Sequence, residues 1–138
     1  MRIDTIEQAL RELCALDVQG EGYDLAYRLA ADNLRLGVGV VADSCNPIEL
    51  TRRAWESVAR GAGAEYVNVE VVCSGRDEHR RRVETRPCTV PGLGMPTWQD
   101  VLAREYHPWT VERVVIDTAG RTERESFEEL LARASARR

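Results

Sequence analysis

Apolar residues recur at helical spacing along much of the chain. The clearest series has intervals of four, three and four residues, which places its members on one face of a helix: Tyr23, Tyr27, Ala30 and Leu34. Other stretches begin with residues typical of helix starts, such as Asn46 followed by Pro47. The sequence thus predicts helices over residues 5–19, 22–36, 46–61, 76–86, 97–107 and 122–138.

Short, continuous apolar runs separate several of these helices. Such runs are typical of buried parallel strands, and they lie at 38–42, 66–73 and 111–116. Residues 1–4 are too few for a strand, and we interpret them as the end of one. Strands that alternate with helices predict an α/β fold with an open, parallel, three-layer sheet. A length of 138 residues supports a single domain, residues 1–138.

Composition limits the classes of protein to consider. The hydrophobic fraction of 43% and the charged fraction of 30% are typical of a globular chain. The formal net charge of -4 argues against a nucleic-acid partner, because such binding relies on neutralising phosphates. No apolar run approaches the roughly 20 residues of a membrane span, and no signal-peptide core is present. We therefore expect a cytoplasmic protein without a membrane partner.

The chain contains no lysine, and its 19 basic residues are all arginine. Chemistry that needs a lysine of this chain, such as a Schiff base or a phosphate-loop ammonium, is therefore excluded. Two cysteines and two histidines have the side chains of zinc ligands, but their spacing does not indicate a zinc site. Cys73, His79, Cys88 and His107 match no common zinc spacing. We interpret the cysteines as reduced thiols.

Polar residues follow each predicted strand. Asp4, Asp43 and the pair Asp117-Thr118 come directly after apolar runs or at their ends. The carboxyl ends of parallel strands share one edge of a sheet, which is where ligands bind in such folds. Carboxylates at this edge suit phosphate and magnesium chemistry, as proton acceptors or as holders of the metal's water shell. Taken singly, each aspartate is equally explained as a helix cap or a solvated loop residue.

The predicted helix over 76–86 is rich in arginine. Several arginines have an acidic residue four positions away, as in Glu78 with Arg82 and Arg80 with Glu84, so a solvated, salt-bridged face is one reading. The other reading is an arginine lid over residues 76–96 that closes on phosphates, because the guanidinium fork binds phosphate oxygens bidentately. Arg86 lacks an acidic residue four positions away on either side.

Four segments together resemble one family. The segments are RIDTIEQAL, GVGVVADSCNP, VEVVCSGRDEHRRRVETR and VVIDTAG. In this order they resemble the small P-loop kinases of the predicted-kinase group, and are similar to zeta-toxin-like and chloramphenicol-phosphotransferase-like proteins. The resemblance implies a P-loop kinase sheet, ATP and Mg²⁺ as cofactors, and a small-molecule phosphate acceptor as substrate.

The resemblance also implies roles for individual residues. Asp4 corresponds to the aspartate that handles the acceptor hydroxyl, and Arg82 and Arg86 correspond to catalytic lid arginines. Asp43, with Asn46, corresponds to the residues that support the magnesium shell, Asp43 acting indirectly through water. Nucleotide contacts would come from the remaining members of the implied set: Arg80, Asp117 and Thr118.

One part of the family pattern is missing. Kinases of this kind begin with a strand, the motif GxxxxGK[ST] and a helix, whereas only three residues precede Asp4. We therefore expect a chain that lacks the first strand, the phosphate loop and the first helix and is inactive by itself. The missing strand would leave the strands over 38–42 and 66–73 with unpaired edges, which favours self-association.

Two other functions remain open. The chain could be a degenerate, non-catalytic binding protein that keeps the residues of the substrate edge and of the lid but does not hydrolyse ATP. It could instead be an arginine-helix module that binds polyanions, although the acidic net charge argues against this.

Overall fold

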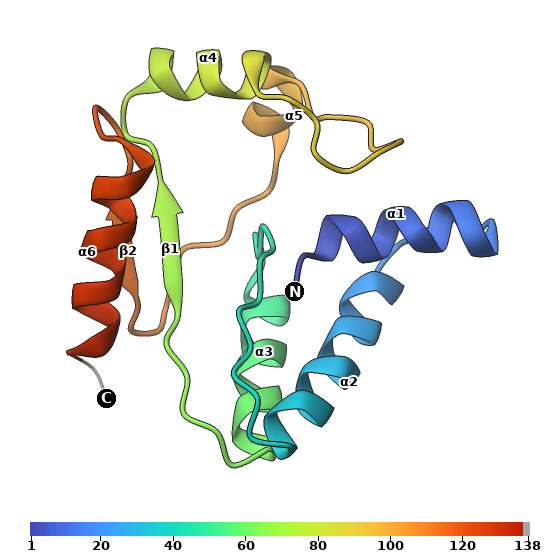
Figure 1. Cartoon of the computed structure of the whole chain (residues 1–138). Helices are drawn as coiled ribbons and strands as arrows, with labels where there is room; N and C mark the ends of the chain where they lie inside the picture. The colour runs from blue at the N-terminus through green and yellow to red at the C-terminus, as the bar shows by residue number, and fades with distance from the viewer. Residues whose placement is uncertain (137–138) are drawn as a thin grey trace. The chain divides into compact units, whose positions relative to one another are not determined.

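The computed structural model describes residues 1–136. The protein is mixed α/β, 51% helical, and the described residues form six helices and a two-stranded parallel sheet (Figure 1). The chain divides into two compact units. The first unit comprises residues 1–66, 88–95 and 104–107, and the second comprises residues 67–87, 96–103 and 108–136. None of the described helices combines the length and apolar character needed to cross a membrane.

Three helices build the first unit: α1 (Ile3–Cys14), α2 (Glu21–Arg35) and α3 (Glu49–Gly61). α1 packs against α2, and α2 packs against α3. The buried positions of α2 are occupied by small residues, Ala26 and Ala30, one helical turn apart. Small side chains at this spacing allow close approach of the neighbouring helices, with Ile3 and Ala59 also buried.

The second unit is built on two strands, β1 (Val69–Val72) and β2 (Val114–Asp117). They pair in parallel, with Val69 opposite Val114 and Val72 opposite Asp117. The unit also holds α4 (Arg76–Thr85), α5 (Trp98–Ala103) and α6 (Glu123–Ser135). α6 packs along β2 and α5 packs on α4. Val114 and Ile116 are completely buried, so β2 carries the centre of this core.

The predictions for the second unit are largely confirmed. Both strands lie inside or beside their predicted ranges, and α4 ends one residue before the predicted limit. α5 is shorter than predicted, because it ends at Ala103 and segment 104–107 leaves it to join the first unit. The predicted last two residues of the final helix, 137 and 138, lie outside the described residues.

The prediction of a buried strand over 38–42 is wrong. This segment has no strand assignment, and the side chains of Val38 and Val41 are 50% and 79% exposed. Its end does pair in parallel with the N-terminal residues, through one isolated bridge between Arg2 and Asp43. Because a single bridge at one end satisfies few backbone groups, residues 38–42 do not form a strand.

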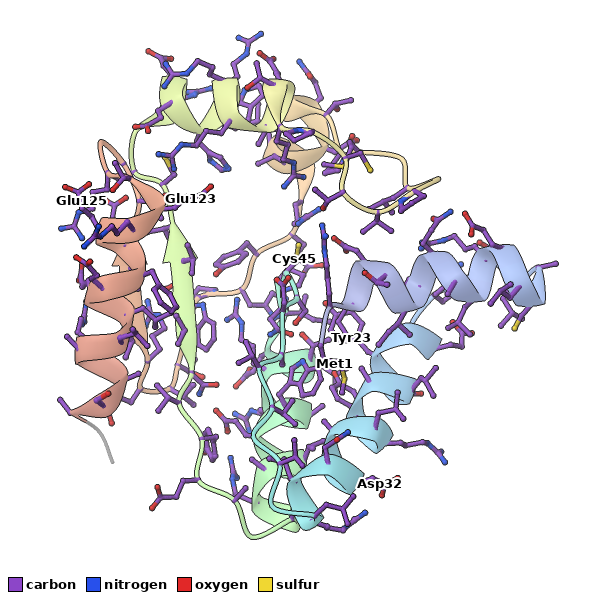
Figure 2. The ribbon with its side chains drawn as sticks, viewed as in Figure 1. Met1, Tyr23, Asp32, Cys45, Glu123 and Glu125 are labelled. Carbon is purple, nitrogen blue, oxygen red and sulfur yellow. The ribbon has the colours of Figure 1, made fainter. Side chains whose placement is uncertain are left out.

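Two predicted helix starts are corrected. α1 begins at Ile3, so Thr5 lies inside the helix and is not its N-cap. α3 begins at Glu49 with Ile48 as N-cap, whereas Asn46 adopts a left-handed conformation with φ of 42°. The predicted cap of the last helix is confirmed. Thr122 Oγ1 accepts from the backbone N–H of Glu125, and the Glu125 carboxylate accepts from that of Thr122. Figure 2 shows Glu125 at the start of α6.

The two threonines give a matched test of helix capping. We expect Thr122→Ala to lower the free energy of unfolding by about 1 kcal/mol, because the helix loses a side-chain acceptor for its first-turn N–H groups. Thr5→Ala should change it by less than about 0.5 kcal/mol, since Thr5 is exposed within α1 and alanine is the better helix former. Urea unfolding followed by circular dichroism measures both, and equal losses would contradict the capping assignment.

Candidate functional site

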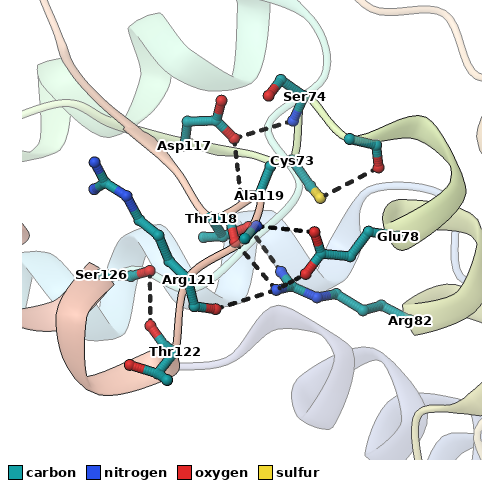
Figure 3. A network of polar contacts seen from close by, with 12 residues as sticks. Cys73, Ser74, Glu78, Arg82, Asp117, Thr118, Ala119, Arg121, Thr122 and Ser126 are labelled. Carbon is teal, nitrogen blue, oxygen red and sulfur yellow. Dashed lines mark hydrogen bonds and ion pairs between the residues drawn. The ribbon is translucent and has the colours of Figure 1, made fainter.

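The carboxyl ends of β1 and β2 meet at one edge of the sheet, as the sequence predicts. Asp117, the last residue of β2, lies beside Ser74, which follows β1 (Figure 3). Asp117 Oδ1 accepts from the backbone N–H groups of Ser74 at 3.0 Å and Ala119 at 3.1 Å. Hydrogen bonds from the Ser74 side chain and from these two N–H groups lower the pKa of Asp117 to about 2. The carboxylate is therefore ionised at neutral pH and serves as an acceptor.

Arg82 of α4 is bound to the loop that follows β2. Its Nη1 donates to Thr118 Oγ1 at 2.9 Å, and its Nη2 donates to the carbonyl oxygens of Thr118 at 3.1 Å and Arg121 at 3.3 Å. Nη2 also lies 2.5 Å from Glu78 Oε1. The Thr118 hydroxyl in turn donates to the Val72 carbonyl oxygen at 2.9 Å. The guanidinium therefore joins α4, the end of β1 and the loop after β2.

Glu78 completes this network from the same helix. Its second carboxylate oxygen accepts from the backbone N–H of Gly120 at 2.9 Å. This hydrogen bond and the neighbouring guanidiniums of Arg82 and Arg81 lower the pKa of Glu78. Sequence reasoning treated Glu78 only as a helical partner of Arg82. The contact between Glu78 and the loop after β2 could have been suspected only from Gly120. Its φ of 67° marks a turn that directs an N–H toward α4.

The other two predicted arginines of α4 point to solvent. Arg80 Nε donates to Glu84 Oε1 at 2.8 Å, as the i,i+4 spacing predicts, and both side chains are about half exposed. Arg86 is exposed, and its backbone N–H donates to the Arg82 carbonyl oxygen at 3.0 Å, which closes the end of the helix. Of the arginines assigned to the lid, Arg82 thus binds the loop after β2, whereas Arg80 pairs with Glu84 within α4 and Arg86 is exposed.

The remaining predicted residues belong to the first unit. Asp4 is exposed in the first turn of α1, and its Oδ2 lies 3.8 Å from Arg2 Nη2. Asp43 is the bridge partner of Arg2, so the two predicted aspartates lie at the same end of one short parallel pairing. Asn46 Oδ1 is buried and has no hydrogen-bond partner among the described residues. An unpaired buried oxygen of this kind is a site where a polar ligand group would be stabilised.

Metal-ligating groups do not cluster in the part of the chain that the structure describes. No three or more side chains of histidine, cysteine, aspartate or glutamate there are arranged to hold an ion. The four cysteines are free thiols.

The comparisons with known proteins identify no relative. The chain matches no protein-family model, and neither the curated proteins nor the solved structures contain a match. The functional assignment therefore depends on the residues and contacts described above.

The decrease of thermal stability in acid should depend on the protonation of the Asp117 carboxylate. Because its pKa falls from 3.8 to about 2 in the folded chain, its stabilising contribution is present above about pH 4 and is lost as the pH falls through about 2. We expect the Tm of the wild-type protein to decrease more steeply over this range than that of Asp117→Asn. Thermal unfolding at closely spaced pH values measures both slopes, and identical slopes would be evidence against an ionised, hydrogen-bonded Asp117.

Replacing Arg82 tests whether its contacts hold the second unit together. Arg82→Ala should lower the free energy of unfolding by about 1–2 kcal/mol, because several charge-assisted hydrogen bonds to the loop after β2 are lost. Arg81→Ala removes the same charge from an exposed neighbouring position and should change it by less than about 0.5 kcal/mol. Chemical denaturation measures both variants. A larger loss for Arg81→Ala would exclude the proposed role of Arg82.

Proposed function

We propose that the chain is of the ATP-dependent P-loop small-molecule kinase type, with the nucleotide contacts in the second unit. Because the chain contains no GxxxxGK[ST] motif, it transfers no phosphate by itself. The observation that carries this proposal is the hydrogen-bonded junction of Arg82 with Thr118. This junction joins α4 to Asp117-Thr118. The resemblance assigns α4 to the lid and Asp117-Thr118 to nucleotide binding. The proposal includes the predicted three-layer arrangement of a P-loop kinase sheet, which is more specific than the mixed α/β fold described above.

The residues at this edge suit a phosphorylated ligand. Arg82 and the ionised Asp117 hold the loop 117–121 in a defined conformation through its backbone groups. Beside it, α4 carries exposed guanidiniums at Arg80, Arg81 and Arg86. Arginines on the solvent side of a fixed helix can bind phosphate oxygens bidentately without first breaking the contacts that position the helix.

The resemblance assigns the acceptor and the metal to residues of the first unit. In such kinases the residue matching Asp4 takes the proton of the acceptor hydroxyl, while the hydroxyl oxygen bonds to the γ-phosphorus and the bond to the leaving ADP oxygen breaks. Asp43 is exposed and can reach an ion through water, which suits Mg²⁺, an ion that keeps several waters when it binds with phosphates. Bound ATP with Mg²⁺ supplies the transferable phosphoryl group. The unpaired Asn46 Oδ1 supports a polar ligand near this loop.

The two alternatives predict different results in the same experiments. A non-catalytic binding protein that keeps the substrate residues binds a hydroxyl compound without needing Mg-ATP, and it forms no ADP. A polyanion-binding module binds heparin or RNA with an affinity that falls steeply with salt, and it has no preference for ATP.

Two arginines with the same kind of ion pair allow a test of nucleotide binding. Arg80 in α4 and Arg124 in α6 each donate from Nε to a glutamate four residues later, at 2.8 Å in both cases. We expect Arg80→Ala to weaken Mg-ATP binding about three- to tenfold, because a phosphate-facing cation is lost. Arg124→Ala removes the same charge and the same kind of ion pair and should leave the affinity unchanged.

Isothermal titration of the full chain with Mg-ATP measures both variants, and ADP formation with a panel of hydroxyl compounds measures transfer. Absence of Mg-ATP binding by the wild-type chain, or equal weakening in the two variants, would refute the proposed site.

A further inference from the structure

A histidine from a distant part of the first unit caps the start of α3. The backbone N–H of Glu49, the first residue of α3, donates to Nδ1 of His107 at 3.2 Å, although 58 positions separate the two residues. The helix's own N-cap, Ile48, provides no side-chain acceptor. In return the backbone N–H of His107 donates to the Pro47 carbonyl oxygen at 2.8 Å. Segment 104–107 is therefore joined to the start of α3 by a reciprocal pair of hydrogen bonds.

A buried arginine strengthens the same junction. Arg52, only 3% exposed, donates to the carbonyl oxygens of Asn46 at 2.8 Å, Pro47 at 3.0 Å and His107 at 2.9 Å. Its guanidinium also lies over the Tyr106 ring, 4.9 Å from the ring centre. These contacts, together with the two hydrogen bonds between His107 and the start of α3, form what we call the His107 latch.

The latch requires a neutral imidazole. A backbone N–H can only donate, so Nδ1 of His107 must carry a lone pair and the ring proton must reside on Nε2. Nε2 lies 2.8 Å from Glu105 Oε1, where its proton can be donated. Protonation adds an N–H at Nδ1, directly opposite the Glu49 N–H and at the positive end of the α3 dipole. The contact with Glu105 survives protonation, but the contact with α3 does not.

The other charged groups at the latch have partners of their own. Glu105 lies on the histidine's own segment and faces Nε2. On α3, the Glu49 carboxylate is paired with Arg53, and Arg52 is itself a donor. Arg104, on the same segment as His107, donates to the Cys45 thiol at 2.9 Å. Loss of the Nδ1 lone pair therefore leaves the Glu49 N–H without its imidazole acceptor.

We infer that the His107 latch is a pH-sensitive switch. It is closed when the imidazole is neutral and opens when the imidazole is protonated, because the hydrogen bond from the Glu49 N–H to Nδ1 is then lost and the start of α3 loosens. Segment 104–107 stays bonded to Pro47 through the His107 N–H and through Arg52. This device is independent of the proposed phosphotransferase activity, since it needs neither a nucleotide nor an acceptor. Its consequence for any ligand at the adjacent loop would be a loss of order there at acidic pH.

Nuclear magnetic resonance of the full chain tests this inference directly. At neutral pH the nitrogen shifts of the imidazoles should show the Nε2–H tautomer for His107. On acidification, exchange of the Glu49 amide proton should become about tenfold faster than in His107→Asn at the same pH, as loss of a hydrogen bond of ordinary net strength implies. In that variant the asparagine carbonyl can accept from Glu49 at every pH.

The second histidine serves as the internal control. His79 packs against Trp98 in the second unit, so His79→Asn should leave the acid response of the Glu49 amide unchanged. The Nδ1–H tautomer for His107 at neutral pH would overturn the inference, and this measurement needs no variant. Equal exchange rates of the Glu49 amide in the neutral and protonated states of His107, after correction for intrinsic exchange, would overturn it as well.

Discussion

The parallel pairing of β1 with β2 determines how the rest of the second unit is arranged. Because the two strands run the same way, the residues after both strands lie at one edge, where the Ser74 N–H reaches Asp117. The ionised carboxylate then orders the loop after β2, and that loop offers the carbonyl oxygens that Arg82 binds. A change of register by one residue would move every one of these groups to the wrong place.

Both units use an arginine in the same way. Arg52 in the first unit and Arg82 in the second lie on helices and donate to backbone carbonyl oxygens of segments distant in the sequence, at His107 and at Thr118 and Arg121. A guanidinium has five N–H donors in a rigid plane, so it can serve several carbonyl oxygens at once, which a lysine ammonium does with less geometric definition. In a chain without lysine, the abundant arginines thus act as internal connectors as well as surface charges.

The candidate site could be predicted in part. Asp117 and Thr118 were identifiable because they end an apolar run, and that run is β2. Arg82 was identifiable as a functional candidate, but its bonds to the loop after β2 depend on a turn at Gly120 that no periodicity reports. The role of His107 escaped sequence reasoning, because a cap supplied from a distant segment leaves no local pattern around α3.

The sequence by itself determined the helices with strong local signals, such as the Thr122 capping box, and the strand runs that lie in β1 and β2. These features depend on interactions within a few residues or on local apolar character. Only the tertiary structure decided that Val38 and Val41 stay exposed, that α3 begins at Glu49 and that Arg82 binds the loop after β2. Each of these outcomes depends on which backbone donors and acceptors from distant segments come within reach, and local pattern carries no information about that.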